Sequence, residues 1–124
     1  MKLNTLFMIN FILAILFGLG FTLMPATMSD FYGTALTPAG LYVGQLFGLS
    51  LIGFAVLTWL GRGLTDPASR QAIVTALFVS NSIGVVVSIV NQLAGVVNAL
   101  GWSTVAIYVL LALGFGYFRF VKTE

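Results

Sequence analysis

The chain has 124 residues, of which 60% are hydrophobic and only 6% are charged, and its mean hydropathy is +1.10. Soluble globular domains carry about 25% charged residues, so this chain lacks a surface suited to water and belongs in a lipid bilayer. The absence of cysteine and histidine excludes disulfides and thiolate or imidazole metal sites, and a net charge of +2 does not favour a nucleic-acid partner.

Four segments are long and apolar enough to form transmembrane helices. A helix that crosses the hydrocarbon core of a bilayer needs about 20 mostly apolar residues, and clusters of proline and glycine separate most of the segments. The four predicted spans are residues 3–23, 41–60, 72–92 and 100–120. We therefore predict an all-α membrane protein, a four-transmembrane-helix bundle that forms a single transmembrane domain over residues 1–124.

The first span, residues 3–23, has an apolar run longer than the about 7–15 residues of a signal-peptide core, so we expect a retained helix. Asn10 is the polar residue nearest its middle, and Ala14 and Gly18 follow on the same helix face. No Asp, Glu, Lys, Arg or His lies in the middle of this or any other span. Because such residues form the proton relays of membrane transporters, the sequence does not favour proton-driven export.

The second span, residues 41–60, contains a GxxxG pair. Gly44 and Gly48 form this pair, and Gln45 lies beside them. Small residues at this spacing let two helix backbones approach closely, so we expect both glycines to pack against another helix. The segment before this span is the longest loop, and its "SDFYG" stretch predicts a short turn on the membrane surface.

The third span, residues 72–92, mixes aliphatic residues with hydrogen-bonding ones. Asp66 lies between Arg62 and Arg70 and is a candidate for a loop ion pair or a helix N-cap. Either Thr65 or Asp66 can cap a helix that begins at Pro67, ahead of this span. With about 100° between successive helix residues, most of the polar and small residues share one third of the circumference. They are Ser80, Asn81, Gly84, Ser88, Asn91, Gln92 and Gly95. We expect this polar face to point toward protein and the aliphatic face toward lipid.

Three interpretations of the polar face remain open. It can serve helix packing, in which small residues bring helices together and side-chain amides hydrogen-bond between helices. The residues predicted for packing are Gly44, Gly48, Ser80 and Gly84. It can also line a ligand pocket, for which the predicted residues are Asn10, Gln45, Asn81, Ser88 and Gln92. The third interpretation is a contact face for another subunit.

The fourth span, residues 100–120, is followed closely by the last basic residues, and the basic residues predict the orientation of the chain. They are Lys2, Arg62, Arg70, Arg119 and Lys122. In a four-span protein all of them fall on one side of the membrane, and the positive-inside rule assigns that side to the cytoplasm. We therefore predict a multi-pass protein of the inner (cytoplasmic) membrane with cytoplasmic N and C termini.

Three stretches give the chain a family resemblance. "DFYG", "GQLFGLSLIGFAVLTWL" and "NALGWSTVAIYVLLALGFGYF" resemble small uncharacterised bacterial four-span membrane proteins that are broadly DoxX-like. The resemblance covers nearly the whole chain. It implies a four-helix fold and a bacterial membrane location, and it carries no catalytic residue over to this sequence.

Two functions fit these features. The first is a non-catalytic accessory or scaffold subunit of a larger bacterial membrane assembly, with other subunits or further copies of the chain as partners in the bilayer. The alternative is a binder or carrier of a hydrophobic small molecule, such as a lipid or quinone, in a polar-lined pocket within the bundle. An enzyme is not expected, because the serines of the third span have no histidine or lysine base nearby. No cofactor or metal is predicted.

Overall fold

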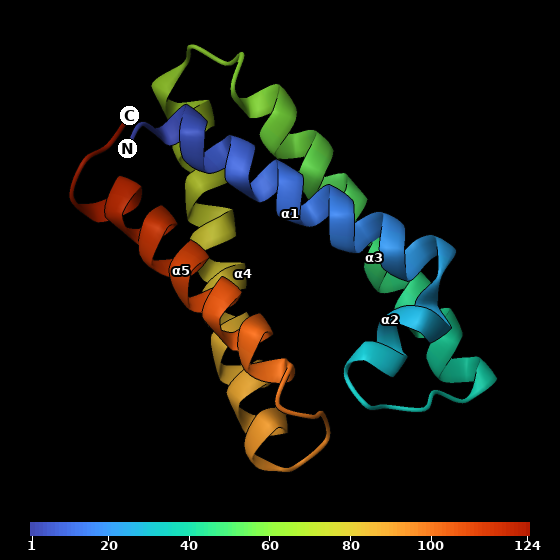
Figure 1. The fold of residues 1–124 in the computed structure, drawn as a ribbon. Coiled ribbons are helices and arrows are strands. Elements are labelled where there is room, and N and C mark those ends of the chain that lie inside the picture. Colours follow the sequence, from blue (N-terminus) through green and yellow to red (C-terminus); the bar gives the residue numbers. More distant parts are fainter.

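The computed structural model describes residues 1–124 as an all-helical chain without strands (Figure 1). Its five helices are α1 (Leu3–Leu23), α2 (Pro25–Phe31), α3 (Pro38–Gly61), α4 (Pro67–Leu93) and α5 (Gly101–Phe120). All except the short α2 are long and apolar enough to cross a membrane. The predicted all-α bundle with four candidate membrane spans is therefore confirmed, and the 7 residues of α2 lie within the segment predicted as a loop.

The helix starts explain where the observed bounds differ from the predicted ones. Pro38 and Pro67 occupy the first turns of α3 and α4, where proline fits because its missing N–H is not needed. The side chains of Thr37 and Asp66 cap these helices by accepting hydrogen bonds from the backbone N–H of Gly40 (3.1 Å) and Ser69 (3.0 Å). Both helices therefore begin several residues before the apolar segments.

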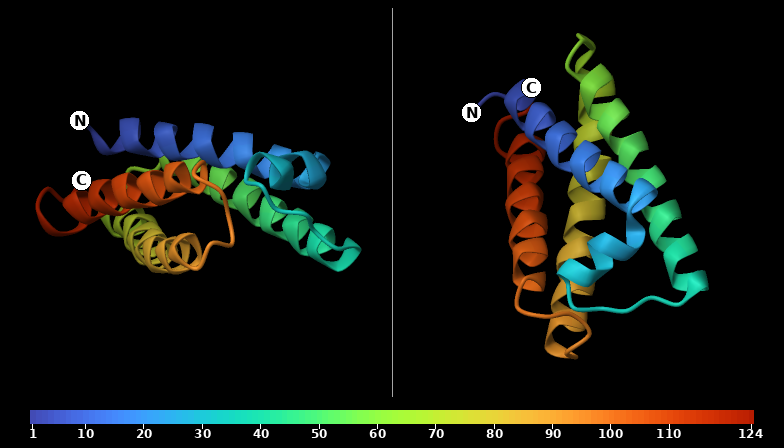
Figure 2. Two further views of the ribbon diagram at one scale, coloured as in Figure 1. Left: turned by 60° about the horizontal axis from the view of Figure 1, so that its bottom comes forward. Right: turned by 45° about the vertical axis from the view of Figure 1, so that its right-hand side comes forward.

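The long helices form two antiparallel pairs that diverge from one end (Figures 1 and 2). Helix α1 packs along α3, and α4 packs along α5, whereas contacts between the two pairs are few. We call the end where α1 begins and α5 terminates the joined end, and the opposite end the open end. Both chain termini lie at the joined end (Figure 1), as an even number of spans requires.

Glycines set the spacing within each pair. A Cβ atom placed on Gly48 of α3 would lie only 2.6 Å from the backbone nitrogen of Thr22 and 2.7 Å from the carbonyl oxygen of Gly18 on α1. Only glycine permits this contact between backbones. In the other pair, a Cβ atom on Gly84 of α4 would lie 2.5 Å from the ring of Tyr108 on α5. Close contacts within both helix pairs thus depend on missing side chains.

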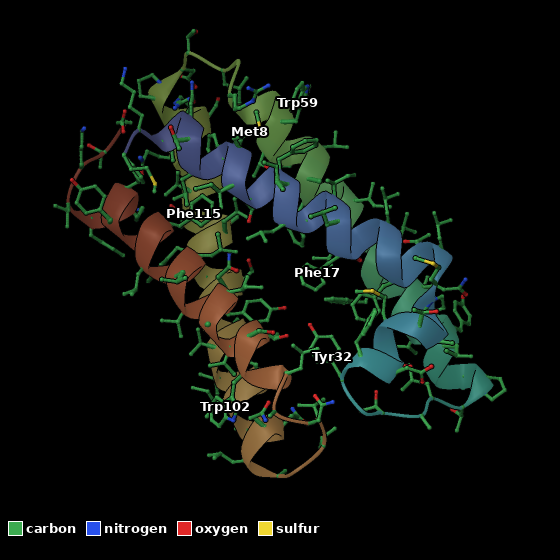
Figure 3. All side chains as sticks on the ribbon, viewed as in Figure 1. Met8, Phe17, Tyr32, Trp59, Trp102 and Phe115 are labelled. Carbon is green, nitrogen blue, oxygen red and sulfur yellow. The ribbon has the colours of Figure 1, made fainter.

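The joined end holds the apolar core of the molecule. Nine buried side chains from α1, α4 and α5 make up this cluster: Leu3, Leu6, Phe7, Ile73, Val74, Leu77, Leu111, Phe115 and Phe118. Figure 3 shows Phe115 at this end. Because these side chains come from both helix pairs, they hold the pairs together at this end.

Hydrogen bonds reinforce the joined end. The Arg70 guanidinium donates through Nη1 to the carbonyl oxygens of Gly61 (3.1 Å) and Leu64 (3.2 Å), and through Nη2 to Asn4 Oδ1 (2.8 Å). It therefore connects the start of α4 with the end of α3 and the start of α1. All five basic residues lie in the turns and connections at this end, which is the charge distribution that the four-span arrangement predicted.

Candidate functional site

A cavity of about 500 Å³ separates the two helix pairs beyond the joined end. Helices α1, α3, α4 and α5 all contribute to its walls, which are mostly hydrophobic. Four phenylalanines supply much of this surface: Phe17, Phe21, Phe47 and Phe54. Figure 3 shows Phe17 and Tyr32 in the space between the pairs. We call this space the large cavity.

The large cavity begins where the core stripes of two helices change from leucine to asparagine. Leu6 on α1 and Leu77 on α4 belong to the apolar core, and residues four positions further along a helix lie on the same face. Those residues are Asn10 and Asn81, which line the large cavity and are only 5% and 6% exposed. On both α1 and α4, an amide side chain follows a leucine on the same helix face, and the two amides form a polar floor of the cavity.

The two asparagines retain unused hydrogen-bonding groups. Asn81 Nδ2 donates to the carbonyl oxygen of Leu77 (2.7 Å), a bond within its own helix that leaves the amide oxygen free. Asn10 Nδ2 is buried and has no hydrogen-bond partner in the protein. An unpaired buried donor costs about 1–3 kcal/mol. In this conformation the donor is shielded from the cavity, and a rotation about the terminal torsion, which is broad for asparagine, would turn it toward the cavity.

A second, smaller cavity of about 240 Å³ lies toward the open end between α4 and α5. Its lining is more polar and includes Ser88, Asn91 and Gln92 from α4. Four residues line both this small cavity and the large one, so the two adjoin: Tyr32, Val97, Thr104 and Tyr108. Gln92 Oε1 is buried without a hydrogen-bond partner, while Gln92 Nε2 donates to the carbonyl oxygen of Asn98 (3.0 Å).

The large cavity opens sideways between α3 and α4. Its exposed lining residues belong to these two helices: Phe47 and Phe54 are 38% and 39% exposed, and Ser50 and Ser80 are also exposed. Lining residues from α1 and α5 are buried or half-buried. In a bilayer, this opening faces the region of the acyl chains, so a lipophilic molecule reaches the cavity without crossing water.

A small hydrogen-bond network crosses the open end. The backbone N–H of Asn98 donates to the carbonyl oxygen of Tyr32 (2.9 Å), and Asn98 Nδ2 donates to the carbonyl oxygen of Phe31 (3.1 Å). Thr104 Oγ1 donates to the Tyr32 hydroxyl (3.1 Å). These bonds connect the segment after α2 with the α4–α5 connection and with α5, and they bound both cavities on that side.

The structure brings together four of the five residues predicted for a pocket. Asn10 and Asn81 line the large cavity, and Ser88 and Gln92 line the small one. Gln45 lies elsewhere: it is exposed on α3 and donates through Nε2 to the carbonyl oxygen of Thr22 (3.2 Å) on α1.

The residues predicted for packing divide in a similar way. Gly48 and Gly84 lie in close helix contacts, and a Cβ atom on Gly44 would touch Pro25 only at an ordinary 3.7 Å. Ser80 is exposed and lines the large cavity instead of a helix contact.

If the polar face of α4 served helix packing, its side chains would hydrogen-bond to neighbouring helices, but most of them bond within α4. Asn91 Nδ2 donates to the carbonyl oxygen of Val87 (2.9 Å), and Ser88 Oγ donates to that of Val85 (3.1 Å). Asparagine and serine reach the carbonyl one turn earlier most easily, and the cavities separate this face from α1 and α3. The face therefore borders open space more than it joins helices.

Sequence reasoning missed the aromatic walls of the cavities. In a soluble protein, apolar periodicity separates buried from exposed residues, but in a membrane span both the lipid-facing and the cavity-facing sides are apolar. Tyr32 and Tyr108 were also missed as lining residues. Tyr108 lies within a span, where a tyrosine is a polar signal of the same kind as Asn10, whereas Tyr32 lies in the connection after α2.

Neither cavity is lined by a charged side chain. The chain also contains no group of three or more Asp, Glu, His or Cys residues placed to hold a metal ion. The chemistry available at this site is hydrogen bonding by amides and hydroxyls within apolar walls, which suits binding of an uncharged molecule.

No protein-family model, curated protein or solved structure matches the chain. The resemblance to DoxX-like proteins therefore stays a prediction, and the site is interpreted from its own residues.

Proposed function

We propose that this chain is a non-catalytic membrane protein that binds or carries a hydrophobic small molecule, such as a lipid or quinone, in the large cavity. Ligand pockets are usually about 300–1,000 Å³ in volume, with apolar walls and a few placed polar groups. The large cavity, at about 500 Å³, has these properties, and its lateral opening gives a lipophilic ligand direct access from the bilayer.

The observation that carries this proposal is the buried, unpaired amide of Asn10. If the space beyond Leu6 served only to pack helices, a leucine at this position would extend the core at no polar cost. The buried donor is instead unfavourable until it meets an acceptor. A ligand carbonyl, ether or hydroxyl oxygen in the large cavity supplies that acceptor, which explains why asparagine stands on the core face.

The test compares retained molecules in two leucine variants. Native protein purified in mild detergent is expected to keep one class of lipophilic molecule well above its share of the membrane lipids, detected by mass spectrometry of the extract. Asn10→Leu fills the polar floor and is expected to abolish this enrichment. Gln45→Leu removes an amide outside both cavities and keeps it. Equal retention by both variants, or no enrichment in the native protein, contradicts the proposal.

The volume of the cavity bears on the alternative role as an accessory subunit. A transmembrane helix about 10 Å in diameter and 30 Å long occupies several times 500 Å³, so the large cavity suits a small molecule better than a partner helix. An accessory role would use the outer, lipid-facing surface. It stays a prediction, and crosslinking in the membrane followed by identification of the attached protein tests it.

We also propose an inner-membrane location with both termini in the cytoplasm. The support is the clustering of all five basic residues at the joined end, together with the positive-inside rule. Because the chain has no cysteine, single cysteines report the side directly. In intact cells, Ala99→Cys is expected to react with a membrane-impermeant maleimide, and Thr123→Cys is expected to react only after lysis. The reverse pattern contradicts this orientation.

A further inference from the structure

Two of the buried side-chain atoms without a hydrogen-bond partner belong to amides that line the two adjoining cavities. One of these atoms is a donor and the other is an acceptor. Asn10, whose Nδ2 is a donor, lines the floor of the large cavity, and Gln92, whose Oε1 is an acceptor that lies against Gly101 of α5, lines the small cavity. Both atoms are buried without a partner. A buried polar atom that lacks a partner is uncommon in a folded protein and calls for an explanation.

The spacing of the two atoms follows from α4. Asn81 lines the cavity floor with Asn10, and Gln92 follows eleven residues later on α4. At 1.5 Å per residue, this separation corresponds to about 16 Å along the helix axis. Tyr32, Thr104 and Tyr108 line both cavities, so one elongated molecule passing these residues reaches both ends.

The charges of the protein restrict the ligand further. No Lys, Arg, Asp or Glu lines either cavity, and the basic residues all lie at the joined end. An ionised group buried without an opposite charge loses several kcal/mol or more of hydration. A carboxylate, phosphate or ammonium group is therefore disfavoured in these cavities, whereas a hydroxyl group can donate to Gln92 Oε1 when this side chain turns from Gly101 toward the small cavity.

We infer that the ligand is a neutral, elongated amphiphile with a hydrogen-bond acceptor such as a carbonyl at the Asn10 end and a hydroxyl at the Gln92 end. Its apolar middle contacts the phenylalanines of the large cavity. This inference rests on the proposed function and adds to it the chemical class of the ligand and its direction in the site.

A matched series of twelve-carbon probes tests this inference on the full-length protein in detergent. The series consists of methyl dodecanoate, methyl ω-hydroxydodecanoate and ω-hydroxydodecanoate, which have an acceptor only, both groups, and both groups with a charge. We expect the neutral hydroxy ester to bind about two- to tenfold more tightly than methyl dodecanoate, the range of one net hydrogen bond, and the anion to bind more weakly than either ester.

One substitution locates the hydroxyl group. Gln92→Met keeps the length of the side chain and removes its acceptor, so it is expected to reduce the affinity for the hydroxy ester to that for methyl dodecanoate. Gln45→Met, at an amide outside both cavities, is the control and leaves the preference unchanged. Because the probe series uses the unmodified protein, the test stands even where Gln92→Met fails to fold.

The outcomes separate this inference from the proposed function. Equal binding of the two esters, or binding of the anion as tight as that of the hydroxy ester, overturns the inference while the ligand site stands. Failure of every probe to bind, together with no enriched molecule in the native protein, overturns the proposed function itself.

Discussion

The two ends of the space between the helix pairs are built in opposite ways. At the joined end, nine apolar side chains fill the interior, and the Arg70 guanidinium donates to three oxygen atoms. Toward the open end, the interior contains two cavities that are bordered by amide side chains. The change occurs within one helical turn, between Leu6 and Asn10 and between Leu77 and Asn81. Positions that are locally unfavourable for folding are often functional, which is why we propose the ligand site beyond this turn.

The largest expected effect comes from breaking the joined end. Phe115 is completely buried in the core cluster, and Phe→Ala in a soluble core costs about 3–5 kcal/mol. Because lipid is as apolar as the core, only the packing part of this cost applies in a membrane, and we expect Phe115→Ala to lower the unfolding free energy by about 2 kcal/mol. Reversible unfolding in mixed detergent micelles measures it. Leu113→Ala, on the exposed lipid-facing side, is the control and is expected to change little.

A second large effect separates the two members of one helix pair. Gly48→Val places a side chain against the backbones of Thr22 and Gly18, and overpacking of this kind costs about 1–3 kcal/mol. Gly53→Val is the matched control on the same helix, because no heavy atom lies within 4 Å of a Cβ atom at Gly53. Similar unfolding free energies for the two variants would show that α1 and α3 do not pack through Gly48.

Replacing Asn10 with leucine extends the apolar core by one helical turn toward the open end. Asn10→Leu removes a buried unpaired donor, so we expect the protein to become more stable by about 1 kcal/mol and at the same time to lose ligand retention. Stability and binding then change in opposite directions, as they do at a site that sacrifices stability for function. A variant that is destabilised yet still retains the ligand contradicts this assignment of Asn10.

A smaller effect is expected at the open end. Asn98→Ala removes the side-chain bond to Phe31 and a local bond from the Leu100 N–H. Each hydrogen bond contributes about 0.5–1.5 kcal/mol, so global stability falls modestly while the helix pairs separate more freely. Spin labels on Ala39→Cys and Ala99→Cys report this as a longer and broader distance distribution. Asn91→Ala, which removes an amide bonded within its own helix, is expected to leave the distribution unchanged.

The smallest effect concerns the cap of α4 at the joined end. The Ser69 hydroxyl and then the Ser69 backbone N–H donate to Asp66 and lower the pKa of this carboxyl below its ordinary value of 3.8. The charged form is therefore favoured by folding, so its contribution is present above pH 3.8 and is lost as the pH falls through the lowered pKa. Thermal unfolding of Asp66→Ala is expected to show a weaker pH dependence below this value than the native protein. Identical profiles contradict the capping role.

The helices were predictable because each depends on a local signal. The first span is correct at both ends, and the capping pattern of Asp66 and Pro67 marks the true start of α4. The arrangement of the helices was not predictable, because apolar residues face lipid, protein or a cavity with equal ease. Asn10 and Asn81 stood out in the sequence as polar residues in apolar helices. That both lie next to the same cavity, one turn beyond the core, follows only from the packing of Leu6 and Leu77 in the structure.

An experimental structure in nanodiscs prepared with native lipids tests the central claim most directly. We predict elongated non-protein density in the large cavity, within hydrogen-bonding distance of the Asn10 amide, with the helix pairs still apart. Helix pairs closed against each other, with the amides of Asn10 and Asn81 bonded directly to one another and no density between them, would contradict the account.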